Sequence, residues 1–176
     1  MNPSQIVLKL VLDELHQPLK LANFDDRFMI QKKIYLTQLT GLDLFYRFGW
    51  YIRGPYSREL TGDAFALKEQ MDRGDDEHEH QKLGRDAAKL AETARSFWEN
   101  CPKGISKSDW VELLASLHYL KHIAWWPKGT QTYFECIYRG LVENKPRFKG
   151  RKSDARAAWD HLNEVGLIRH KVLRAL

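Results

Sequence analysis

The densest group of potential metal ligands in this 176-residue sequence is the run Glu77, His78, Glu79 and His80. Two histidines two residues apart can share a metal ion when the backbone is extended. The flanking residues are polar on both sides, however, and offer no apolar shell to orient the imidazole rings. A solvated loop is the favoured interpretation, so we expect no metal and no cofactor. The alternative is a metal-dependent nuclease that uses these four residues.

Other arrangements that could support catalysis are sparse. His118 and His122 lie one helical turn apart, but the sequence supplies no evident third ligand, so a helix surface or a packed site is expected. The surroundings of Cys136 are not electropositive, and a reactive thiol is therefore not indicated. Phosphate-binding loops, dinucleotide fingerprints, nucleophile elbows and HExxH helices are absent from the sequence. We therefore predict that the protein is not an enzyme.

The surplus of positive charge is concentrated near the C-terminus. The formal net charge is +5, and residues 139–176 hold ten Lys and Arg against four Asp and Glu, whereas residues 1–138 hold 18 against 19. A concentrated basic segment is typical of a phosphate-binding face. An ordinary solvated helix surface is the alternative. We predict contact with DNA or RNA through a basic loop that contains Arg147, Lys149, Arg151 and Lys152.

A second candidate nucleic-acid surface lies between residues 27 and 60. There, basic residues alternate with aromatic ones, and such a mixture can bind phosphates and stack bases. The alternative is that the aromatic side chains are core and the arginines form a solvated strand face. The basic residues assigned to this surface are Lys32, Lys33, Arg53 and Arg58.

The aromatic residues also support a different class of function. Trp and Tyr are favoured at the energetic centres of protein interfaces. Exposed tryptophans would therefore act as anchors for a protein partner, and the candidates are Trp50, Trp125 and Trp126.

Helical periodicity and capping residues predict a mainly α fold with a small β element. An alternating strand is expected near 45–52, closed by a turn at Gly54 and Pro55, and a short strand over 167–173. Leucines and Trp110 give the helix near 109–122 an amphipathic stripe. The helices are expected at about 3–16, 25–41, 57–74, 85–98, 109–122, 132–145 and 154–166.

The same elements suggest one compact domain, residues 1–176, with winged-helix-like packing. Residues 1–74 form a helix-helix-strand-GPYS-helix core, residues 75–84 a polar loop, and residues 85–176 a helical part with the basic C-terminal segment. No apolar run approaches the length of a membrane span, and the N-terminal residues lack the features of a signal peptide. We expect a cytoplasmic protein without membrane contact.

Two segments of the sequence resemble a known family. They are 27–36, with the sequence RFMIQKKIYL, and 51–57, with the sequence YIRGPYS. The pair resembles the YwgA-like proteins of bacteria and archaea and, more distantly, the Panacea (SocA-like) antitoxin domain. The resemblance implies a compact helical fold, a defence-related context and, from the Panacea relatives, neutralisation of a toxin by protein contact.

The positions that match the family motif are Gln31, Lys32, Tyr35, Tyr51, Gly54, Pro55, Tyr56 and Ser57. A structural role explains several of them equally well, since Gly54 and Pro55 can set a turn and Ser57 can cap the following helix. The leading prediction is a nucleic-acid-binding regulatory or defence-associated protein. The alternative is a protein-interaction module, either antitoxin-like or an assembly subunit.

Overall fold

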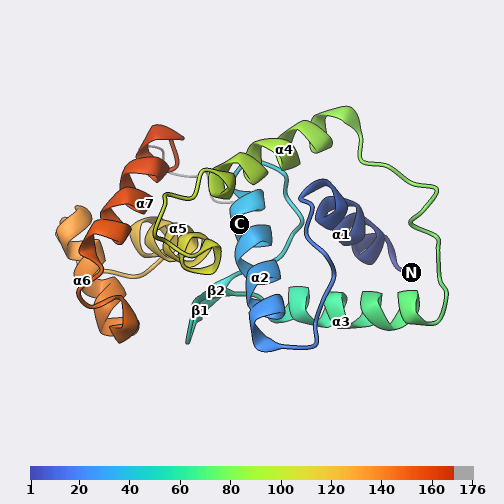
Figure 1. Cartoon of the computed structure of the whole chain (residues 1–176), viewed down its shortest axis with the longest axis horizontal. Helices are drawn as coiled ribbons and strands as arrows, with labels where there is room; N and C mark the ends of the chain where they lie inside the picture. The colour runs from blue at the N-terminus through green and yellow to red at the C-terminus, as the bar shows by residue number, and fades with distance from the viewer. Residues whose placement is uncertain (169–176) are drawn as a thin grey trace. The chain divides into compact units, whose positions relative to one another are not determined.

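The computed structural model describes residues 1–168 and confirms a mainly helical class with a small β element. Within these residues the chain forms seven α-helices, one 3-10 turn and a two-stranded sheet (Figure 1). The helices are α1 (Pro3–Glu14), α2 (Phe24–Gln38), α3 (Arg58–Asp72), α4 (Arg85–Glu99), α5 (Lys107–His122), α6 (Phe134–Asn144) and α7 (Lys152–Glu164); the 3-10 turn η1 is Pro146–Phe148.

The chain divides into two compact units. Unit 1 comprises residues 1–48 and 56–96, and unit 2 comprises residues 49–55 and the described residues from 97 onward. The polar segment 75–84 is an irregular connection between α3 and α4. The prediction that the whole chain forms one domain stays a prediction, as does winged-helix-like packing.

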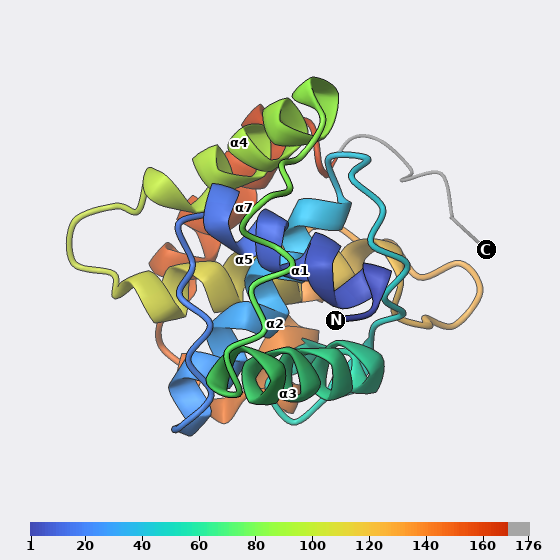
Figure 2. The same cartoon turned by 90° about the vertical axis from the view of Figure 1, so that its right-hand side faces the viewer.

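Unit 1 is built on three capped helices. Asn2 and Gln5 form a capping box at the start of α1, while Asn23 caps α2 and Ser57 caps α3. α1 packs against α3, and the two helices lie next to each other in both views (Figures 1 and 2). Several side chains in the core of this unit have no exposed surface; among them are Leu8, Leu12, Ile34, Leu60 and Leu67.

Unit 2 is organised around α5, which packs against α6 and α7. The predicted amphipathic stripe underestimates the burial of α5, because every residue from Trp110 to Leu120 is buried. The buried set therefore includes polar side chains, and Glu112, Ser116 and His118 have no exposed surface. Buried polar groups of this kind need hydrogen-bond or ion-pair partners inside unit 2.

The β element differs from the predicted strand. The strands are β1 (Gly49–Tyr51) and β2 (Gly54–Tyr56), with the turn at residues 52–53 rather than at Gly54 and Pro55. Residues 42–48 form no strand because the Gln38 side chain takes the place of a strand partner: its amide accepts from Tyr46 N at 3.0 Å and donates to Tyr46 O at 2.9 Å. Most of the strand expected at 167–173 lies outside the described residues.

None of the helices within residues 1–168 combines the length and the apolar character that a membrane span requires.

Candidate functional site

Two residues of the family motif form a buried clamp in unit 1. The Gln31 amide donates to Ser57 O at 2.9 Å and accepts from Ser57 N at 2.8 Å, and it also donates to Thr61 Oγ1 at 2.9 Å. Ser57 Oγ accepts from Leu60 N at the start of α3. Gln31 and Ser57 are 5% and 1% exposed, so this part of the motif holds α2 against the start of α3.

Other predicted residues of unit 1 also point inward. Tyr35 is buried and meets Phe48 edge-on, with ring centroids 5.2 Å apart, and the Tyr56 hydroxyl accepts a hydrogen bond from Thr61. Lys32 is only 2% exposed, and its Nζ lies 4.8 Å from the centroid of the Phe28 ring. This burial does not fit the predicted role of Lys32 as a phosphate contact. Lys33 is half-buried and Arg58 is exposed.

In unit 2 the hairpin comes close to a buried ion pair. Lys145 Nζ donates to Glu112 Oε1 at 2.6 Å and lies 5.4 Å from the centroid of the Trp50 ring. Gly54 has a φ of +85°, and a Cβ there would lie 2.7 Å from Ser116 Oγ and 3.1 Å from Lys145 Nζ. Only glycine fits this close approach, which explains the glycine of the family motif structurally.

The electrostatics of Lys145 follow from this enclosure. Burial lowers the pKa of the Lys145 ammonium, and the Glu112 carboxylate offsets part of that effect by attraction and hydrogen bonding. Arg147 and Arg53 add repulsion that lowers the pKa further. Because its side chain is 2% exposed, Lys145 stabilises the interior rather than offering an amine to solvent.

Most of the predicted basic loop is neutralised by carboxylates. Arg147 pairs with Glu112 and, at 2.8 Å, with Asp109. Arg151 pairs with Asp109 and with Asp154, each at 2.8 Å. Burial tends to raise the pKa of Asp109, but the two arginines outweigh burial and hold that pKa below its ordinary value.

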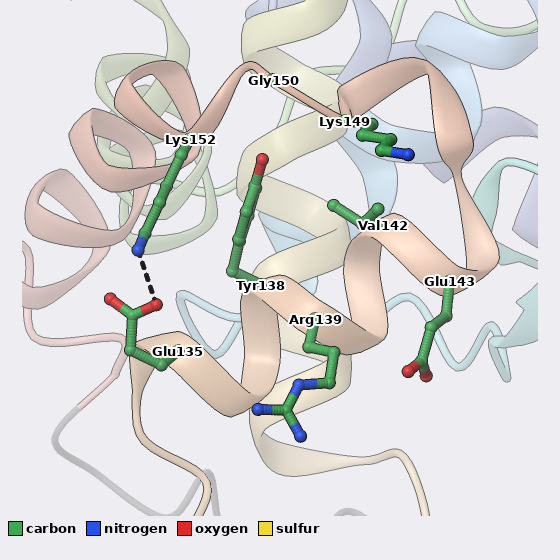
Figure 3. A pocket seen from close by; sticks show the side chains of 8 residues that line it. All are labelled: Glu135, Tyr138, Arg139, Val142, Glu143, Lys149, Gly150 and Lys152. Carbon is green, nitrogen blue, oxygen red and sulfur yellow. Dashed lines mark ion pairs between the residues drawn. The ribbon is translucent and has the colours of Figure 1, made fainter.

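The remaining basic residues face a groove of about 420 Å³, which we name the α6–α7 groove (Figure 3). Lys152 crosses its edge to pair with Glu135 at 2.7 Å, and Arg156 reaches the other oxygen of Glu135 at 3.3 Å. Lys149 is exposed and forms no ion pair within residues 1–168. The lining residues are Glu135, Tyr138, Arg139, Val142, Glu143, Lys149, Gly150 and Lys152.

The three predicted anchor tryptophans have different environments. Trp50 is half-buried and packs on Tyr119, with centroids 5.5 Å apart. Trp126 is also half-buried and donates to Leu120 O at 2.7 Å. Trp125 is 85% exposed. On the hairpin, Tyr51 is 57% exposed and Arg53 is partly buried.

The histidines within the described part of the chain do not belong to a larger cluster of metal ligands. No group of three or more His, Cys, Asp or Glu side chains within residues 1–168 is arranged to hold a metal ion. His118 and His122 lie with ring centroids 4.9 Å apart, and His118 has no exposed surface. Burial, with a smaller contribution from His122, lowers the pKa of His118 to about 3, so the imidazole is neutral at physiological pH.

Sequence reasoning missed Glu112 and Lys145, which organise the interior of unit 2. One signal was present: Glu112 interrupts the apolar run of α5 between Val111 and Leu113. A carboxylate in an otherwise buried helix needs a cationic partner. The partner itself could not be identified, since many basic residues were available.

No protein-family model matches the chain, and neither a curated protein nor a solved structure matches it. The resemblance to the YwgA-like proteins therefore stays a prediction.

Proposed function

We propose that the protein is a protein-interaction module that presents Trp125 to a partner from an anchored loop. The 123–133 loop joins α5 to α6 (Figure 2). It carries three large, exposed apolar or aromatic side chains: Trp125 at 85%, Tyr133 at 70% and Ile123 at 47%. The exposure of Trp125 is the observation that carries the proposal, because tryptophan is strongly enriched among the residues that dominate binding energy.

The loop is fixed at both ends, which supports a binding role. Trp126 donates to Leu120 O at 2.7 Å, and its ring lies so close to Gly140 that a Cβ there would be 2.8 Å from Cη2. Lys121 Nζ donates to the carbonyl and the hydroxyl of Thr132, each at 2.9 Å. A loop held in this way loses less conformational freedom when a partner binds, so more of the contact energy appears as affinity.

The test compares two exposed aromatic residues. Trp125→Ala removes the proposed anchor, while Phe45→Ala removes a side chain that is also 85% exposed but belongs to unit 1. Partners retained by the wild type are purified, and their affinity for the wild type and for both variants is measured by calorimetry. We expect Trp125→Ala to weaken binding at least about 30-fold. Equal losses for both variants, or no loss, would refute the proposal.

Nucleic-acid binding is the second candidate function. It is favoured by Lys149 and Arg139, both exposed and neither paired with a carboxylate within residues 1–168. Phosphate contacts of this kind would make binding fall steeply with salt. Fluorescence anisotropy with short DNA and RNA strands at two salt concentrations tests it. Absence of binding at low salt contradicts this candidate and leaves the Trp125 proposal untouched.

A further inference from the structure

The 123–133 loop lies in a stretch of the chain without carboxylates. Between Glu112 and Glu135 the sequence contains neither Asp nor Glu. These two flanking carboxylates are already neutralised, because Glu112 is buried in its ion pair with Lys145 and Glu135 pairs with two cations of α7. Any positive charge on the loop therefore has no acidic side chain of its own segment to pair with.

Lys128 lies at a tight turn close to Trp125. Thr130 N donates to Pro127 O at 3.0 Å and closes a β-turn that has Lys128 at its second position. Lys128 is exposed and forms no ion pair with a carboxylate that the structure describes. It follows Trp125 by three residues, and three residues of chain span at most roughly 11 Å. A partner that contacts the indole therefore comes within reach of this ammonium.

A second ammonium lies at the other end of the loop. Lys121 Nζ donates to the carbonyl and the hydroxyl of Thr132, each at 2.9 Å. Both acceptors are neutral, so these bonds hold the Lys121 side chain without cancelling its charge. Thr132 directly precedes Tyr133, whose side chain is 70% exposed. Positive charge thus accompanies both of the exposed aromatic side chains, Trp125 and Tyr133.

We propose that the partner segment bound by the 123–133 loop is acidic and carries apolar side chains next to its carboxylates. The apolar side chains pack on Trp125 and Tyr133, and a carboxylate pairs with Lys128. Such complementarity speeds association and selects against basic partners. This inference rests on the proposed function and specifies the chemistry of the partner at the same site.

The charge of the surrounding unit fits an acidic protein segment. The described residues of unit 2 hold 12 Lys and Arg against eight Asp and Glu, whereas unit 1 holds 13 against 15. A nucleic-acid strand is a poorer match, because sites for single strands follow the phosphate backbone with a basic groove. The 123–133 loop contains a single Lys and no Arg. One cation beside two aromatic rings suits one carboxylate flanked by apolar side chains.

Fluorescence anisotropy on the full chain tests the inference with four labelled probes. The first is a short peptide of Glu, Leu and Ser, and two matched peptides carry Gln or Lys in place of every Glu. The fourth probe is a single-stranded oligonucleotide. The variants are Trp125→Ala and Lys128→Gln, and the matched control is Lys103→Gln, which removes the same charge from an exposed position of unit 2 outside the loop. Thermal unfolding verifies that all three keep the fold.

We expect the acidic peptide to bind the wild type and the Lys103→Gln control equally. Lys128→Gln should weaken binding about two- to fivefold, since an exposed ion pair contributes modestly, and this difference should vanish at high salt. Trp125→Ala should weaken binding at least about tenfold at either salt concentration. The Gln peptide should bind the wild type more weakly than the acidic peptide, and the Lys peptide more weakly still.

Equal affinity for the acidic and Gln peptides, or no binding of the acidic peptide, would overturn the inference. Equal losses for Lys128→Gln and Lys103→Gln would also overturn it, because the attraction would then come from the overall charge. Tighter binding of the oligonucleotide that depends on Trp125 would assign the loop to a nucleic-acid strand instead. The partner measurements with Trp125→Ala decide the proposed function separately, so the two can fail independently.

Discussion

Unit 2 contains two sets of polar side chains that differ in how completely they are satisfied. In its interior, Glu112 and Lys145 form an ion pair that is almost fully enclosed. At the α6–α7 groove, Arg139, Glu143 and Lys149 have no ion-pair partner within residues 1–168. The interior set lies where a missing partner is costly, whereas the groove set is solvated and available. Charge count alone therefore does not identify a binding surface, because neighbouring residues of one basic segment belong to opposite sets.

The largest expected difference between the two sets is in stability. Glu112→Ala leaves Lys145 buried without its carboxylate, and removing one partner of a buried pair costs about 3–5 kcal/mol. Glu143→Ala removes the same type of side chain from the groove and should change the free energy of unfolding by less than about 0.5 kcal/mol. Denaturant unfolding measures both. Equal changes in the free energy of unfolding would show that the interior ion pair contributes no more to stability than Glu143 does at the groove.

A second comparison uses two glycines with similar backbone angles. Gly54 and Gly150 have φ values of +85° and +82°, but only at Gly54 would a Cβ meet neighbouring atoms. Gly150→Ala should cost about 1 kcal/mol from backbone strain alone. Gly54→Ala should cost about 2–3 kcal/mol, since it adds a clash with Ser116 and Lys145. If chemical denaturation gives the same loss in the free energy of unfolding for both variants, the close approach of Gly54 to α5 does not contribute to stability.

The smallest expected effect is a dependence on pH. The pKa of His118 is lowered to about 3 in the folded state, so below about pH 6.5 only the unfolded chain takes up this proton. Stability should therefore fall as the pH falls. Between pH 6 and pH 5 the wild type should lose about 1 kcal/mol more than His118→Leu. Parallel stability curves for the two proteins would mean that His118 is protonated in the fold.

The helices could be predicted from sequence because apolar spacing and caps are local signals. Asn23 and Ser57 cap helices that begin close to the expected positions. The strand was misplaced because the Gln38 side chain satisfies the backbone of Tyr46, a contact that strand propensity does not report. Local patterns describe a backbone well, but not the side chains that compete for its hydrogen bonds.

The candidate sites were less predictable, for a physical reason. Alternation of Lys and Arg along the basic loop gives no sign that Arg147 and Arg151 meet Asp109, 38 and 42 residues earlier in the chain. The same holds for tryptophan, since an aromatic residue follows both Trp50 and Trp125, yet Trp50 is half-buried and Trp125 is 85% exposed. Which residue faces solvent is decided by contacts distant in sequence, and a single sequence does not contain that information.

The position of the hairpin in the chain has a consequence for synthesis. Residues 49–55 belong to unit 2, although unit 1 sequence precedes and follows them. Lys145, which Gly54 approaches, is translated 91 residues later. At typical elongation rates this separation corresponds to roughly 5–18 s. Its neighbours on α5, Ser116 and Tyr119, are also translated later than the hairpin. Until they are made, Trp50 and Tyr51 are accessible to chaperones, because Trp50 has no Tyr119 ring to pack on.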